Sequence, residues 1–177
     1  MGGGTGETER AVELGLLWLA AMQKQDGHWQ LHRRDGKSDS DPGYPDGGTV
    51  QTSTGATALA LLPFLGAGHT HKEGNHTRTV RRGLDWLVRQ QKSNGDFHDW
   101  DDLGRPSSFY AHGQATIVLC EAYALTKDPT LREPARKAIA YLCESQHPVT
   151  GGWKYRPHSD GDMSVFGWQI MALESAR

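Results

Sequence analysis

The chain has 177 residues, which is enough for one sizeable hydrophobic core, and a formal net charge of −2. Such a small charge gives no global electrostatic reason to bind nucleic acid or an anionic membrane, so neither is expected as a partner. No apolar run approaches the roughly 20 residues that span a bilayer, and residues 1–6 lack the apolar segment of a secretion signal. We therefore expect a soluble segment without a transmembrane helix, and the cytoplasm is the favoured compartment.

Helical periodicity predicts an all-α chain of three hairpins, in which residues 1–7 are a flexible linker and residues 8–177 a single domain. Every first helix has one apolar stripe, and every second helix is apolar or small nearly all round, as is typical of an enclosed helix. The first helices are expected at 8–24, 78–92 and 132–146. The second helices are expected at 52–66, 110–126 and 163–176. The hairpins therefore occupy 8–66, 78–126 and 132–176.

Two details of the first hairpin bear on its packing. The apolar stripe of its first helix, expected to face the core, consists of Leu14, Leu17, Trp18 and Ala21. Pro63 lies late in the second helix and predicts a kink or an early end near Leu62, because proline lacks the N–H that a helix interior needs.

A Gln-x-x-x-Gly-x-aromatic phrase closes the first helix of each hairpin. The three copies begin at Gln23, Gln91 and Gln146 and end at Trp29, Phe97 and Trp153. The third copy carries one extra residue before its glycine. Recurrence at intervals of 68 and 55 residues indicates one supersecondary unit that is used repeatedly.

Three hairpins of this kind predict an α/α toroid-type array in which outer helices shield inner ones. The array corresponds to half of an α6/α6 barrel. Terminal units of a repeat array need capping. We therefore expect the ring to be completed either by a second copy in a homodimer or by the remainder of a longer protein of which this chain is a fragment.

The repeated phrases resemble those of the terpene cyclase and protein prenyltransferase superfamily, whose helical hairpins carry a Gln…Gly-x-Trp motif. In detail the chain is similar to bacterial proteins described as prenyltransferase and squalene oxidase repeat proteins. The resemblance implies that each glutamine caps neighbouring helix ends and that the aromatic ring stacks on it, which ties the repeats together. These ties are Gln23 with Trp29, Gln91 with Phe97, and Gln146 with Trp153. Phe97 departs from tryptophan, so the middle tie is expected to be weaker.

Acidic loops precede two of the inner helices, where a toroid places its active groups because these loops converge on the lumen. They read Asp99-Trp100-Asp101-Asp102 and Asp160-Gly161-Asp162. Cyclases that protonate an alkene use an Asp-x-Asp-Asp stretch there, and this resemblance makes Asp101 and Asp162 the candidate catalytic acids. Such an acid must stay protonated in a dry, aromatic-lined cavity. Residues around Asp101 match the Asp-x-Asp-Asp motif but lie away from the helix that follows, whereas Asp162 lies at the start of its inner helix without the complete motif. Helix capping is therefore the alternative role for both residues.

Five further residues near the inner helices are candidates for binding a ligand, with core packing as the alternative. They are Asp160, Trp100, Tyr110, His112 and Phe166.

The His-x-His-x4-His cluster of His69, His71 and His76 is the one pattern with metal-ligand spacing. It lies at the opposite end of the hairpins from the acidic loops, and neither a cysteine nor a convincing carboxylate accompanies it. We interpret it as an exposed polar turn and predict no metal and no other cofactor. Protein prenyltransferases use an Asp, Cys and His zinc site, and no matching trio is found, so prenyl transfer is disfavoured.

Three functions remain open at this point. The favoured one is a non-catalytic binding or scaffold module for a peptide, a lipid or a terpenoid, because half a ring cannot seal a dry cavity. The first alternative, implied by the resemblance, is a squalene-hopene cyclase-like isomerase that uses an aspartic acid as general acid. The second alternative is a carbohydrate-processing α/α toroid.

Overall fold

The computed structural model of the chain describes residues 4–31, 52–97 and 108–177. Within these residues it contains six α-helices and no β-strand, which confirms the expected all-α class. The helices are α1 Gly6–Met22, α2 Ser53–Gly66, α3 Thr77–Gln90, α4 Ser108–Thr126, α5 Pro129–Glu144 and α6 Met163–Ser175. None of these helices has the length and apolar character needed to cross a membrane.

Short polar side chains set the start of several helices. α2 begins after Thr52, α5 after Asp128 and α6 after Asp162. In each case a side-chain oxygen accepts a main-chain N–H from the first turn, which would otherwise have no intrahelical partner. The six helices thus lie in the six expected regions of the sequence.

The second helix of the first hairpin does not end early. α2 continues through Pro63 to Gly66, so the expected end near Leu62 is wrong. Leu61 and Phe64, on either side of the proline, are both fully buried in the core. Their burial stabilises this last turn by more than the one hydrogen bond that the proline removes.

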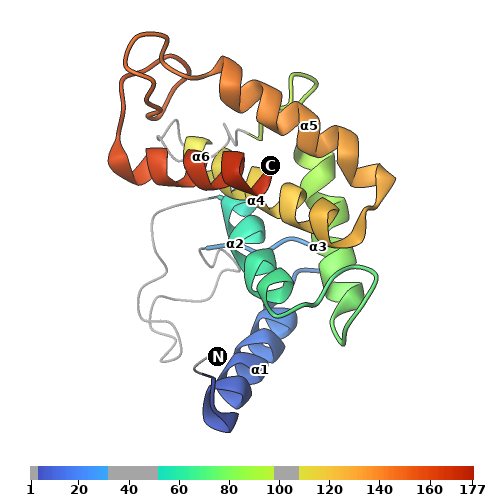
Figure 1. Cartoon of the computed structure of the whole chain (residues 1–177). Coiled ribbons are helices and arrows are strands. Elements are labelled where there is room, and N and C mark those ends of the chain that lie inside the picture. The colour runs from blue at the N-terminus through green and yellow to red at the C-terminus, as the bar shows by residue number, and fades with distance from the viewer. Residues whose placement is uncertain (1–3, 32–51, 98–107) are drawn as a thin grey trace, which may run out of the picture.

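The inner helices form a row in which α4 lies between α2 and α6 (Figure 1). α3 packs on α2 and α5 packs on α4, whereas α1 touches α2 only lightly and α5 touches α6 only lightly. Each of the outer helices α3 and α5 therefore covers the inner helix of the preceding hairpin. This is the expected α/α toroid-type array, and in Figure 1 α1 extends away from the other helices at one end of it.

The central helix of the core is α4, whose residues from Ala111 to Cys120 are all buried. Burial raises the pKa of the Cys120 thiol to about 11, so it stays protonated and packs as a small apolar group. Cys143 is exposed, and both cysteines are free.

The outer helix α1 differs from the expected one-sided helix. Leu14, Leu17 and Trp18 are each more than half exposed, and Ala21 is also exposed. Leu16 is the buried residue of this helix. The expectation of a core-facing stripe is wrong because α1 contacts its neighbours along the Leu16 side alone.

Candidate functional site

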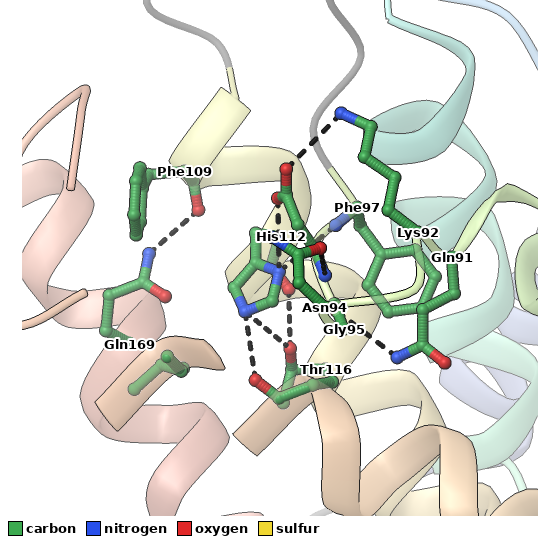
Figure 2. Close-up of polar contacts among 12 residues, drawn as sticks. Gln91, Lys92, Asn94, Gly95, Phe97, Phe109, His112, Thr116 and Gln169 are labelled. Atoms are coloured by element: carbon green, nitrogen blue, oxygen red, sulfur yellow. Dashed lines mark hydrogen bonds and ion pairs between the residues drawn. The ribbon is translucent and has the colours of Figure 1, made fainter. Parts of the chain in front are cut away.

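The glutamines of the repeated phrase bridge successive hairpins. Gln23 Nε2 donates to Gly27 O in its own loop and to Thr79 O near the start of α3, both at 2.9 Å. Gln91 Nε2 repeats the arrangement, with 3.2 Å to Gly95 O and 2.8 Å to Pro134 O in α5; Figure 2 shows the Gln91 amide reaching toward Gly95. These bonds join each hairpin to the next outer helix.

The third glutamine has a different environment. Gln146 Nε2 donates to Gly151 O at 2.8 Å, in its own loop. Among the described residues no further outer helix follows α5, so this amide reaches no second carbonyl. In the third phrase the glutamine therefore keeps the hydrogen bond within its own loop, and among the described residues it makes no hydrogen bond to another hairpin.

The aromatic residues of the phrases are buried and two of them make the same hydrogen bond. The indole N–H of Trp29 donates to Leu19 O at 2.7 Å, and that of Trp153 donates to Leu142 O at 2.9 Å. Both bonds return to the helix that precedes the phrase. The Phe97 ring is equally buried but, unlike an indole, carries no N–H group that could donate to the preceding helix. That the middle tie is weaker stays a prediction, and this missing bond is its physical basis.

His112 lies in a buried polar network between the second and third hairpins (Figure 2). Its Nδ1 accepts the Phe97 N–H at 3.4 Å, and its Nε2 lies 3.2 Å from Ala138 O and 3.5 Å from Thr116 Oγ1. A carboxylate oxygen of Asp96 also lies 3.9 Å from Nδ1, so the ring contacts a carboxylate, a main-chain carbonyl and a hydroxyl group. Because the side chain is 1% exposed, it joins secondary structure elements rather than facing an open lumen.

A second polar cluster surrounds the amino end of α6. Tyr110 Oη lies 2.5 Å from Ser164 Oγ, and Ser164 Oγ donates to Asp162 Oδ1 at 2.5 Å. Tyr155 Oη donates to Asp162 Oδ2 at 3.2 Å. The two tyrosine rings are tilted against each other, with centroids 6.4 Å apart. We call Tyr110, Tyr155, Asp162 and Ser164 the α6 mouth cluster.

The Asp162 carboxylate also caps α6, since its Oδ1 accepts the N–H groups of Ser164 at 3.0 Å and Val165 at 3.3 Å. The hydrogen bond from the Ser164 hydroxyl holds the pKa of this carboxyl below its ordinary value. The same carboxylate raises the pKa of Tyr155, which donates to it. This environment favours the ionised carboxylate, so at neutral pH Asp162 accepts hydrogen bonds and holds no proton that it could donate.

The other expected site residues are scattered. Asp160 is exposed and accepts the Gly161 N–H at 2.7 Å, and this bond lowers the pKa of its carboxyl. Phe166 packs on Trp153, with ring centroids 5.8 Å apart. Asp101 and Trp100 lie outside the described residues.

Of the expected site residues that are described, the structure thus brings Tyr110 and Asp162 together. It adds Ser164 and Tyr155, which the sequence reasoning missed. A serine two residues after a capping aspartate is a recognisable first-turn signal. Nothing in the sequence marks Tyr155, which reaches Asp162 through the fold of its loop.

The histidine cluster is an exposed turn at residues 72–75, as expected, but the expectation is wrong for His71. His71 is buried, and its Nε2 lies 2.8 Å from Asp128 Oδ2 at the start of α5. His69 and His76 contact each other edge to face, with ring centroids 5.0 Å apart. Asp128, which caps α5, thus covers the His71 side chain, whereas residues 72–75 of the turn are exposed.

Comparison with known proteins identifies similar sequences. A family model described as the squalene-hopene cyclase C-terminal domain matches residues 3–115. A drimenyl diphosphate synthase from Streptomyces showdoensis is 31% identical over 114 residues, which cover 63% of this chain and 20% of that protein. A squalene–hopene cyclase from Zymomonas mobilis is 23% identical over 133 residues, which cover 74% of this chain and 19% of that protein. The matched part of the chain spans about a fifth of the length of these curated relatives.

Proposed function

Because the chain belongs to the squalene-hopene cyclase C-terminal domain family, as its repeated phrases indicated, we propose that it is a binding module of that family for an isoprenoid ligand. Two of its relatives are a drimenyl diphosphate synthase and a squalene–hopene cyclase, and both names refer to isoprenoid compounds. The α6 mouth cluster is the surface proposed to hold the polar end of such a ligand.

The environment of Asp162 is the observation that carries this proposal. A cyclase that protonates an alkene needs a carboxylic acid that remains protonated, which burial away from hydrogen-bond donors would provide. Asp162 is only partly buried and accepts hydrogen bonds from two hydroxyl groups and two main-chain N–H groups. A carboxylate with this many donors supports binding and capping rather than proton donation.

The composition of the mouth cluster suits an amphiphilic ligand. Tyr110 and Tyr155 offer hydroxyl groups at one end and ring faces along their length. Met163, the first residue of α6 and the one that follows Asp162, is 84% exposed. Adaptable thioether and aromatic surface next to hydroxyl donors fits an apolar chain with a polar head.

A second candidate function is catalysis with Asp101 as the general acid. The names of the relatives favour it, since both are cyclases or synthases of terpenoids. Under this alternative the chain would form cyclic products and Asp162 would still serve as the cap of α6.

Incubation of the purified chain with squalene and with farnesyl diphosphate, followed by mass spectrometry of the organic extract, separates the two functions. The binding proposal predicts no cyclic product from either substrate. A cyclic product that disappears in the Asp101→Asn variant would overturn it in favour of the cyclase.

Binding itself is tested by quenching of intrinsic fluorescence during titration with farnesyl diphosphate. The Tyr110→Phe variant should bind roughly 5- to 10-fold more weakly, which corresponds to the loss of one hydrogen bond. Tyr123→Phe is the matched control, because Tyr123 lies on the same helix away from the cluster, where its ring contacts Lys127. Equal affinities for both variants, or no binding by the unmodified chain, would exclude the mouth cluster as the site.

A further inference from the structure

Contacts between successive hairpins recur at equivalent positions. One group of these contacts involves the glycines of the repeated Gln-x-x-x-Gly-x-aromatic phrase. A side chain at Gly27 would overlap the carbonyl oxygen of Arg82 in α3, and one at Gly95 would overlap that of Lys137 in α5. Both glycines have positive φ, of 108° and 97°. Each therefore lies directly against the main chain of the next outer helix, beside the glutamine that bonds the same helix.

The third phrase has the same elements without the next helix. A side chain at Gly151 would meet only the Gln146 amide of its own loop, at 3.8 Å. Gln146 Nε2 bonds only Gly151 O, whereas the two preceding glutamines each bond a carbonyl of the next outer helix as well. The receiving surface for an outer helix is thus formed at the third hairpin and is uncovered among the described residues.

The inner helices show the same pattern: a glycine of each of the first two contacts the next inner helix, and the equivalent glycine of the third contacts none among the described residues. A Cβ at Gly55 of α2 would lie 3.2 Å from Gln114 Oε1 of α4, and one at Gly113 of α4 would lie 2.9 Å from the Gln169 amide of α6. Gly167, the equivalent residue of α6, has nothing within 4 Å of that position. Ile170 and Met171, which share its helical face, are 37% and 53% exposed. We call Gln146, Gly151 and this face of α6 the open end.

At the opposite end of the array, α1 has a face that no described residue covers, whereas the same face of its counterpart α3 is covered by α2. Gly15 and Gly83 each lie eight residues before the glutamine of their hairpin. A Cβ at Gly83 would lie 2.8 Å from Leu61 of α2, but one at Gly15 would have nothing within 4 Å. Val80 is fully buried, and its counterpart Val12 is 49% exposed.

The two uncovered surfaces complement each other as successive hairpins do within the chain. We propose that α1 of a second copy occupies the open end, so that two copies associate head to tail into a ring of six hairpins. By equivalence with Thr79 and Arg82 of α3, the carbonyls of Ala11 and Leu14 of one copy would meet Gln146 and Gly151 of the other. By the same equivalence Val12, whose counterpart Val80 is fully buried, would be buried in this contact.

A second copy is the occupant because a single chain carries both halves of the contact. Each copy offers one α1 face and one open end, so a two-fold ring forms two identical joints and leaves neither surface exposed. The contact is also one that the chain already makes twice internally, at Gly27 with Arg82 and at Gly95 with Lys137. This association rests on the repeat contacts alone and is independent of whether the mouth cluster binds an isoprenoid.

Sedimentation velocity of the purified chain measures the association directly. The ring predicts that a species of twice 19.5 kDa predominates at roughly 100 μM, a concentration at which even a contact of modest affinity is occupied. A monomer throughout this range would overturn the proposal, and an open-ended ladder of larger species would overturn the closed ring.

Two variants identify the surfaces. Gly15→Arg and Gly167→Arg each place a large charge in open space on a helix, so both variants should remain folded by circular dichroism. Each should convert the dimer to monomer by blocking one surface. Gly66→Arg is the matched control, because Gly66 also has open space and lies on neither surface, and it should remain a dimer.

Mixing the two monomeric variants tests the head-to-tail geometry. Gly15→Arg keeps an intact open end and Gly167→Arg keeps an intact α1 face, so an equimolar mixture should regain a dimer through one joint. If α1 instead contacted α1 of the second copy, only the Gly15→Arg variant would become monomeric, and mixing the two variants would form no additional dimer. Either of these two results would overturn the proposed arrangement.

Discussion

The Gln91 amide donates a 2.8 Å hydrogen bond to the main-chain carbonyl of Pro134, which lies 43 residues later in the sequence. Gln23 makes the corresponding bond to Thr79 O at 2.9 Å. The same side chain in the same phrase thus joins hairpin one to hairpin two and hairpin two to hairpin three. The helical periodicity of apolar residues is a local property of each helix, whereas these hydrogen bonds help to set the distance between successive hairpins.

Replacement of Gln91 by alanine should lower the stability of the fold measurably. It removes the bonds to Gly95 O and Pro134 O in a partly buried position, so we expect a loss of about 1–3 kcal/mol and a melting temperature lower by several degrees. Gln90→Ala is the control, because the adjacent Gln90 is exposed and bonds only within its own helix. Thermal denaturation followed by circular dichroism at low protein concentration compares the two. Equal melting temperatures would contradict the bridging role of Gln91.

Replacement of His112 by asparagine should destabilise the contact between the second and third hairpins. The ring packs among Phe97, Phe109 and Tyr141 and satisfies the Phe97 N–H, so we expect a loss of about 2–4 kcal/mol in urea denaturation. His158→Asn is the control, since His158 is exposed and its positive φ of 57° is tolerated by asparagine. A small effect at His112 would mean that its network does not stabilise the joint.

Asp128 should make the stability depend on acid pH. Hydrogen bonds from Thr130 and then from His71 hold the pKa of its carboxyl well below the ordinary value of 3.8. A depressed pKa in the folded state contributes stability that is complete above the unfolded pKa and is lost as the pH falls through the folded value. The difference in melting temperature between the wild type and Asp128→Ala should therefore be constant between pH 7 and pH 5 and should begin to shrink as the pH falls below about 4.

At neutral pH the Asp128→Ala variant should lose about 0.5–2 kcal/mol, as expected when a helix loses its N-cap. Asp85→Ala serves as the control, because Asp85 is an exposed residue on α3 that caps no helix. Melting temperatures equal to that of the wild type for both variants at pH 7 would contradict a stabilising role of the Asp128 cap.

Much of the fold was predictable from the sequence, because helix-forming patterns and the repeated phrase are local. The six helices lie where periodicity placed them, and the equivalent glutamines were identifiable from spacing. The partners of these glutamines were not predictable, since Thr79 and Pro134 contribute main-chain carbonyls that any residue could supply. The sequence therefore indicates which side chains recur and does not indicate what they bond.

The errors have physical causes of the same kind. Leu14, Leu17 and Trp18 lie at helical spacing, but periodicity does not reveal whether a neighbouring helix exists to cover them. The mouth cluster was only half predictable, because Tyr155 reaches Asp162 through a loop whose path depends on tertiary contacts. Asp101 lies outside the described residues, so its role as an acid stays a prediction.

The protonation of Asp162 tests the central claim that this residue is an ionised cap rather than a catalytic acid. Carbon-13 NMR titration of the aspartate carboxyl groups, with Asp162 assigned by its absence in Asp162→Asn, measures its pKa directly. The hydrogen bonds from Ser164, from the main chain and from Tyr155 predict a value below 3.8. A value above that, in the range of an acid that stays protonated near neutral pH, would contradict the account and support the cyclase.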